Sequence, residues 1–272
     1  MGYRHINTFS MELSVKNYFL KREQICEDKK SADKKIDPLS VPDKEQGAYI
    51  RFINIDSTNN KQIVKFCNAY GLLFDNISSG RIYNGEVQEL LQKMSIEDFV
   101  IEVKTFRLIV EFYCDIAALI PDEQDKEQRI RIFKEKVSEL RQLSVYNSVY
   151  FDFIIDELED GNDSDKINEY LLAIVRRHIQ DYTNKIHINI DCDVHKTSET
   201  KTTAIDLKGN LLSAMYFRFY LDIVNNVPIK KCKDPKCKNI FAAYKREDKL
   251  YCSGRCSKNH GMRESRKRIK VN

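Results

Sequence analysis

Apolar residues recur at helical spacing over long parts of this chain, most clearly after Ser95. From Phe99 to Ala117 an apolar or aromatic residue returns every three or four positions, and Pro121 ends the pattern. Ser95 and Asp98 have the spacing of a capping pair, which predicts the start of a long, buried helix. Such a stripe could line a cofactor, but core packing is the interpretation that we favour. Further helices are predicted at 11–22, 123–143, from 164 or 165 to 182, and at Leu211–Val224, which Asn210 caps.

In the second half of the chain, one segment changes from the helical period to a period of two. From Ile186 to Val194, apolar residues alternate with polar ones, which is typical of a half-buried strand. A polar turn over residues 195–200 and a second short strand over residues 202–207 complete a predicted β-hairpin.

The first quarter of the chain is less regular. A loop is predicted over residues 27–46, which are rich in Lys and Asp and contain two prolines. A short strand is expected next, at residues 48–55. A helix then begins after Ser57 or Thr58 and ends at Gly71. The apolar face of this helix consists of Ile63, Cys67 and Tyr70.

These elements predict a mainly α chain with one small β-hairpin, an α+β fold in two domains. Residues 1–226 form a helical domain, and residues 227–272 form a basic module. The charge supports this division: the module has fifteen Lys and Arg against four Asp and Glu, whereas the rest has thirty against thirty-seven. Such an excess of positive charge suggests a polyanionic partner, and the alternative is a solvated end that aids solubility.

Composition also bears on location and on the use of cysteine. The chain has no apolar run of about eighteen residues, and its first ten residues lack the pattern of a secretory signal. We therefore expect a soluble cytoplasmic protein with no membrane partner. In that compartment the eight cysteines favour metal binding over disulfides. Four scattered cysteines are expected to be small apolar core residues: Cys26, Cys67, Cys114 and Cys192.

The other four cysteines form two close pairs in the basic module. Cys232, Cys237, Cys252 and Cys256 follow the spacing Cys-x4-Cys-x14-Cys-x3-Cys. Cysteines so close together in a turn or at a helix start can point at one ion, which predicts a single Zn²⁺ site. Four thiolates close the coordination shell, so the ion is expected to be structural rather than catalytic. His260 lies four residues after Cys256 and is an alternative ligand.

Basic residues follow the second cysteine pair at spacings compatible with a helix. On a helix, several of them share one face, where they can contact phosphates or donate to guanine edges. A solvated tail is the alternative interpretation. The candidate nucleic-acid-binding residues are Arg255, Lys258, Arg263, Arg266, Lys267, Arg268 and Lys270.

Signs of catalysis are weak, and we expect a binding protein rather than an enzyme. The chain has no Gly-rich phosphate loop, no Gly-x-Ser-x-Gly elbow and no His-Glu-x-x-His motif. Asp191, Asp193 and His195 fall on one face of the predicted strand, where solvated polar residues are the ordinary occupants. They are nevertheless the site that a helical nuclease would use.

The C-terminal residues resemble a known family. Residues 206–268 contain a hydrophobic helix, "IKKC", the Cys-x4-Cys pair, "NIF", "YCS" and a spaced Arg/Lys series. This stretch resembles the bacterial CGNR-type zinc finger that ends proteins with an ABATE domain, and "KQIVKFCNAYGLL" at residues 61–73 is similar to that helical domain. The family's Cys-Gly-Asn-Arg is Cys-Ser-Lys-Asn here, at residues 256–259.

The resemblance implies a treble-clef-like finger that binds DNA, joined to a helical domain that senses a stress-related ligand. In such a transcriptional regulator the four cysteines of this chain match the zinc ligands, and Arg263, Arg266 and Arg268 match the basic series. Our leading hypothesis is therefore a zinc-finger regulator that binds nucleic acid, DNA rather than RNA, and whose helical domain receives a small molecule or a protein. The alternatives are an interaction subunit of a bacterial defence or toxin-linked assembly and a helical nuclease.

Overall fold

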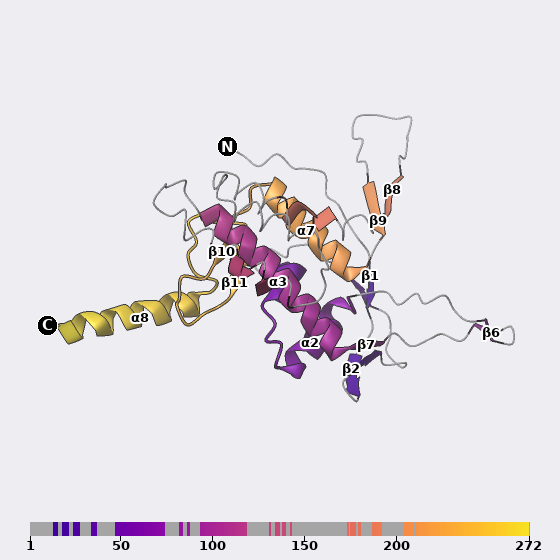
Figure 1. Cartoon of the computed structure of the whole chain (residues 1–272), viewed down its shortest axis with the longest axis horizontal. Helices are drawn as coiled ribbons and strands as arrows, with labels where there is room; N and C mark the ends of the chain where they lie inside the picture. Colours follow the sequence, from indigo (N-terminus) through magenta and orange to yellow (C-terminus); the bar gives the residue numbers. More distant parts are fainter. Residues whose placement is uncertain are drawn as a thin grey trace. The chain divides into compact units, whose positions relative to one another are not determined.

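The computed structural model describes residues 13–15, 18–21, 24–27, 34–36, 47–73, 82–83, 86–87, 93–118, 187–191, 204–208 and 210–271, with single helical positions within 131–142 and 173–180. This part of the chain is mostly helical with small antiparallel sheets (Figure 1), which confirms the predicted mainly α character. The prediction of a single small β-hairpin is wrong, because the described strands form several small sheets. None of the described helices combines the length and the apolar character needed to cross a membrane.

Two compact units make up the chain. One consists of Met1–Val100 and Ile179–Leu221, and the other of Ile101–His178 and Asp222–Asn272. The four clustered cysteines belong to the second unit, together with most of the long helix after Ser95. The predicted domain boundary between residues 226 and 227 stays a prediction.

The first unit contains helix α2, Asn60–Tyr70, which confirms the predicted helix. The predicted cap lies one or two residues too early. The side chain of Asn59, rather than Ser57 or Thr58, accepts hydrogen bonds from the backbone N–H groups of Lys61 and Gln62. Gly71 ends the helix with a φ of 96°, a conformation that glycine adopts without steric cost.

Aromatic rings form the core beside α2. The rings of Phe52 and Phe66 lie 5.3 Å apart between centroids, and Phe99 meets Phe52 edge-on at 5.4 Å. All three side chains are buried, as are Ile63 and Cys67 on the same helix. Cys67 is therefore a core residue, as predicted.

The predicted strand at residues 48–55 is wrong, because this segment forms helix α1, Ala48–Ile53. Five of its six residues are buried, so the segment has no polar face to reveal a helical period. A short apolar run of this kind is compatible with either a buried strand or a buried helix.

The predicted helix at residues 11–22 is also wrong. This segment contains strands β1, Leu13–Val15, and β2, Tyr18–Lys21. Strand β2 pairs antiparallel with β3, Gln24–Glu27, which in turn pairs with β7, Lys93–Ser95. Strand β1 pairs with β4, Lys34–Ile36, so the segment predicted to be a loop contains a strand. The β2–β3 pairing is local, whereas β3 and β7 lie about seventy residues apart, and a pairing at that distance leaves no signal in the nearby sequence.

Three further predicted elements are confirmed: the helix after Ser95, the hairpin before Asn210 and the helix that Asn210 caps. Helix α3 spans Ile96–Ala118, and the Ser95 hydroxyl accepts a hydrogen bond from the Asp98 N–H at 2.9 Å. Strands β8, His187–Asp191, and β9, Ala204–Lys208, form the predicted antiparallel hairpin. Helix α7 is Leu211–Val224, and Asn210 caps it by accepting from the Ser213 N–H at 2.8 Å. Strand β5, Ile82–Tyr83, pairs antiparallel with β6, Glu86–Val87, which the sequence did not predict.

Two predicted helices lie largely outside the described residues. The described positions between 131 and 142, and between 173 and 180, are helical. The turn at residues 195–200 is outside the described part of the chain, as are Cys192, Asp193 and His195. Asp191 ends strand β8.

The cap at Asn59 gives a first testable prediction. Replacing Asn59 with Ala removes the acceptor for two backbone N–H groups and is expected to lower the free energy of unfolding by about 1 kcal/mol. Urea unfolding followed by circular dichroism measures the loss. Asn60→Ala is the matched control, because Asn60 is the exposed first residue of the helix and is not its cap. Equal losses in both variants would contradict the role of the cap.

Candidate metal centre and basic surface

The first cysteine pair lies in the turn of a small hairpin. Strands β10, Ile229–Lys231, and β11, Ile240–Ala242, pair antiparallel, and Cys232 directly follows β10. The Cys232 N–H donates to the Asn239 carbonyl at 2.9 Å, which extends the hairpin by one bond.

Asp234 shapes the loop between these two cysteines. The Asp234 carbonyl accepts from the Cys237 N–H at 2.8 Å, and its side chain accepts from the Lys236 N–H at 3.0 Å. Aspartate in such a turn satisfies backbone donors that a tight loop leaves without partners. The sequence Asp234-Pro235 thus bends the chain so that the two thiols approach each other.

The second pair lies at the start of helix α8, Gly254–Val271. Ser253 precedes this helix, and its hydroxyl accepts from the Cys256 N–H at 3.3 Å. The Lys233 N–H donates to the Leu250 carbonyl at 2.9 Å, which ties the chain before Cys252 to the first loop. This bond brings the two cysteine pairs together.

The four sulfur atoms are close enough to share one ion. All lie within 4.8 Å of one another, with 3.6 Å between Cys237 and Cys252 and 3.5 Å between Cys252 and Cys256. Four thiolates around a tetrahedral ion at about 2.3 Å are separated by about 3.8 Å. The cysteines are free thiols, and their separations exceed a disulfide length of about 2.05 Å. The arrangement could therefore hold a metal ion.

His260 is not a member of this cluster. Its Nδ1 lies 3.1 Å from the hydroxyl of Tyr251, and the two rings are 5.6 Å apart. The fourth member of the cluster is the sulfur of Cys256. Among the described residues, the geometry favours four thiols over the alternative with a histidine.

The environment of the thiols makes metal binding depend on pH. Burial, followed by the neighbouring thiols, raises the pKa of Cys252, and burial also raises the pKa of Cys237. The hydrogen bond with Ser253 lowers the pKa of Cys256. Crowded thiols that resist ionisation need a cation before they can become thiolates. Binding an ion then releases protons, so binding strengthens as the pH rises.

Arg263 of α8 is an internal partner of the first loop. Its guanidinium forms an ion pair with the carboxylate of Asp234, a residue that is only 3% exposed. The side chain of Arg263 is about one third exposed, at 29%. This residue, nominated from the sequence as a nucleic-acid contact, therefore bridges α8 and the loop between Cys232 and Cys237.

Loss of this bridge should destabilise the module that contains the four cysteines. Arg263→Gln leaves a buried carboxylate without its cation, and we expect the free energy of unfolding to fall by about 2 kcal/mol, since the arginine is partly exposed. Thermal and urea unfolding followed by circular dichroism measure this change. Arg266→Gln on the same helix removes an exposed charge and should change stability by less than about 0.5 kcal/mol. A stability loss in the control as large as that in Arg263→Gln would contradict the assignment.

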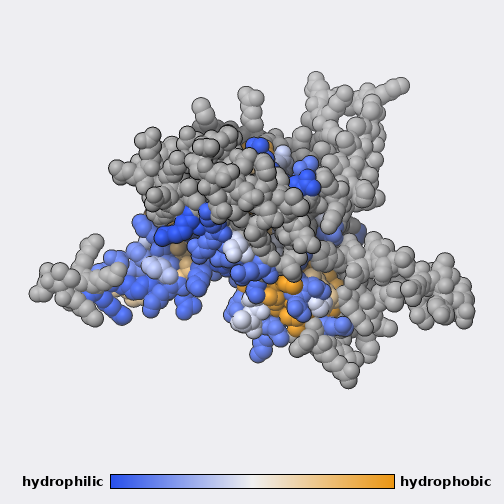
Figure 2. Space-filling view, in the orientation of Figure 1, coloured by the Kyte–Doolittle hydropathy of each residue, from blue (hydrophilic) through white to orange (hydrophobic). Residues whose placement is uncertain are grey.

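Other predicted nucleic-acid contacts lie on α8. Arg255, Lys258 and Arg266 are exposed. The same helix continues through Lys267, Arg268 and Lys270. The structure describes the backbone of these three residues but not their side chains. Figure 1 shows α8 extending from the β10–β11 region to the C-terminus, and Figure 2 shows hydrophilic residues over this part of the molecule.

Sequence reasoning missed a second basic group on the first loop. Lys233, Lys236 and Lys238 are exposed, while the one acidic residue between them, Asp234, is buried against Arg263. The signal was present as alternating lysines between and after the first cysteine pair.

Several other basic residues of the module have internal contacts. Lys230 donates to the Glu247 carbonyl, Arg246 pairs with Asp248 at 2.9 Å, and Lys249 lies 5.2 Å from the ring centre of Phe241. Only some of the basic side chains of the module are therefore left to contact a partner.

No known protein family, curated protein or solved structure matches this chain. The resemblance to CGNR-type fingers stays an expectation from the sequence. The function must be argued from the metal centre and from the charged surface around it.

Proposed function

We propose that this chain is a regulatory protein that binds nucleic acid through a structural zinc module. Cys232, Cys237, Cys252 and Cys256 would hold one Zn²⁺, and helix α8 would present basic residues to the nucleic acid. The observation that carries the proposal is the gathering of four free thiols at the base of a helix with exposed basic side chains.

The donor set supports zinc. Four thiolates in tetrahedral geometry select zinc or iron among the common metals, and zinc prevails in isolated structural sites with this spacing. A closed shell of four ligands offers no position for water or substrate. The ion would thus stabilise the module without taking part in a reaction.

The order of elements supports a treble-clef-like arrangement. A loop in a hairpin, between β10 and β11, supplies the first two thiols, and the start of α8 supplies the other two. In this arrangement the metal fixes the beginning of the helix relative to the hairpin. The basic residues on the loop and on the first turns of α8 would then form one surface.

The charge of that surface favours a polyanion. Six exposed basic residues are described on the loop and on α8: Lys233, Lys236, Lys238, Arg255, Lys258 and Arg266. A helix of eighteen residues can enter the major groove of duplex DNA, whereas the major groove of duplex RNA is too narrow for side chains to read. We therefore place DNA ahead of RNA.

The helical remainder would receive a small molecule or a protein partner. Helices α3 and α7 each contribute residues to both compact units. A ligand that changes either helix would therefore affect residues of the unit that carries the cysteines.

Titration of a labelled DNA duplex of mixed sequence with the full chain tests the proposal. Binding is expected at about 50 mM salt and should weaken steeply towards about 200 mM, because phosphate contacts release counterions. A single-stranded RNA and a duplex RNA serve as comparisons. The absence of binding to every nucleic acid at low salt would contradict the proposal and favour a role in protein interaction.

A further inference from the structure

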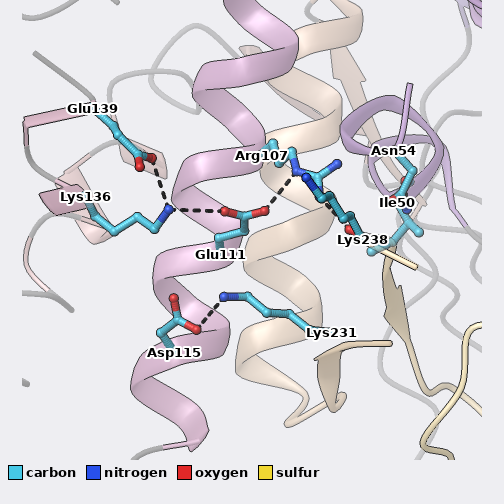
Figure 3. A network of polar contacts seen from close by, with 9 residues as sticks. All are labelled: Ile50, Asn54, Arg107, Glu111, Asp115, Lys136, Glu139, Lys231 and Lys238. Atoms are coloured by element: carbon cyan, nitrogen blue, oxygen red, sulfur yellow. Dashed lines mark hydrogen bonds and ion pairs between the residues drawn. The ribbon is translucent and has the colours of Figure 1, made fainter. Parts of the chain in front are cut away.

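Helix α3 contacts both ends of the loop that contains Cys232 and Cys237 (Figure 3). Lys231, directly before Cys232, forms an ion pair with Asp115 at 2.5 Å. Lys238, directly after Cys237, accepts a hydrogen bond at its carbonyl from Arg107 Nη2 at 2.5 Å. Two residues of one helix thus hold the positions that flank the first cysteine pair.

A third contact joins α3 to the strand that leads into the loop. The buried thiol of Cys114 donates to the Ile229 carbonyl at 3.4 Å. Burial raises the pKa of Cys114 to about 12, so the thiol keeps the proton that it donates. Cys114, predicted to be an apolar core residue, is buried and has this additional bond.

Glu111 orients the arginine of this contact. Its Oε1 accepts from Arg107 Nε at 2.9 Å, and its Oε2 lies 3.6 Å from Lys136 Nζ. Lys136 also pairs with Glu139 at 3.0 Å. A carboxylate between two cations restricts the guanidinium and directs its remaining donors at the Lys238 carbonyl. Figure 3 shows this series of contacts along α3.

Arg107, Glu111 and Asp115 follow each other at intervals of four, which places them on one face of the helix. We propose that this face of α3 positions the loop between Cys232 and Cys237 for metal binding, with Arg107 and Asp115 as its positioning residues. The inference rests on the metal centre proposed above. It extends the metal-binding unit from the C-terminal module to a helix more than a hundred residues earlier in the chain.

The physical reason is that the loop must open before the ion can leave. Opening the loop of the loaded chain breaks its contacts with α3 in addition to the bonds between metal and sulfur. These contacts therefore lower the population of the open state through which the ion escapes. Loss of groups that orient metal ligands commonly weakens metal binding by about 10- to 100-fold.

The two anchors differ in strength. Arg107 is 26% exposed and Glu111 is 17% exposed, so their hydrogen bonds are partly shielded from water. Lys231 is 46% exposed, and an ion pair of this kind contributes little by itself. Arg107 should therefore have the larger effect.

The rate of zinc transfer from the loaded full chain to an excess of a chromogenic chelator tests the inference. We expect Arg107→Gln to release zinc about tenfold faster and Asp115→Asn about two- to threefold faster. Lys104→Gln removes an exposed positive charge from the same helix and should leave the rate unchanged. Circular dichroism of each loaded variant establishes that α3 is still folded.

A charge exchange separates a specific contact from a general loss of stability. Asp115→Lys should accelerate release, and adding Lys231→Asp to it should restore most of the original rate. Release from Arg107→Gln at the rate of the unsubstituted chain, or an equal acceleration in Lys104→Gln, would overturn the inference while leaving the metal centre intact. A chain that takes up no zinc at all would refute the metal centre itself, and the inference with it.

Discussion

Replacing Cys237 and Cys252 together with Ser is expected to abolish metal binding and to unfold the module around β10, β11 and the start of α8. The strands have only three residues each, and the buried apolar residues of the hairpin are few. So small a core cannot offset the entropy of ordering its loops. Structural zinc sites contribute about 10–16 kcal/mol of apparent binding free energy near neutral pH, which here would be folding free energy.

Hydrogen exchange measured by mass spectrometry checks this expectation. The amides of Cys232 and Ala243, which donate to Asn239 and Pro228, should be protected in the loaded chain and exposed in the double variant. Cys67→Ala is the matched control, because it removes a buried cysteine outside the cluster and should leave metal content unchanged. Persistent protection of the hairpin in the double variant would show that the module folds without metal.

Neutralising the basic surface is expected to weaken DNA binding about a hundredfold or more without loss of metal. The variants carry Gln in place of Lys233, Lys236 and Lys238 on the loop, or of Arg255, Lys258 and Arg266 on α8. Each phosphate contact that is lost should reduce the salt dependence of binding by about one unit of slope. Both sets are predicted to contribute, since the loop and the helix form one surface in the proposal.

Fluorescence anisotropy with a labelled duplex at several salt concentrations measures both affinity and slope. A control with the same charge change carries Gln at Lys61, Lys65 and Lys104, which are exposed on α2 and α3. If the control loses as much affinity as the two test variants, binding reflects only net charge. The surface would then not be the binding site.

Local signals explain which elements the sequence predicted. Helix α3 has a cap at Ser95 and a long apolar period, and the β8–β9 hairpin has a clear alternation, so both were found. Helix α1 was mistaken for a strand because it is buried on nearly every side. Strand β2 was mistaken for a helix although only two residues separate it from its partner β3, and the pairing that completes its sheet, between β3 and β7, joins residues about seventy apart.

In the candidate site, the sequence predicted the cysteines but not the contacts that support them. The spacing of the cysteines identified the four thiols that the structure brings together. The partner of Arg263 could not be predicted, because Asp234 lies twenty-nine residues earlier and meets it only after the module folds. The contacts of Arg107 and Asp115 span still longer separations, of 131 and 116 residues. Such pairs depend on how folded elements pack, which spacing along the chain does not encode.

The central claim is that four thiolates of this chain hold one zinc ion, and elemental analysis of the purified full chain by mass spectrometry tests it most directly. The account predicts one equivalent of zinc per chain and none in the variant with Ser at Cys237 and Cys252. Iron in place of zinc, no stoichiometric metal, or the same zinc content in the double variant would contradict it.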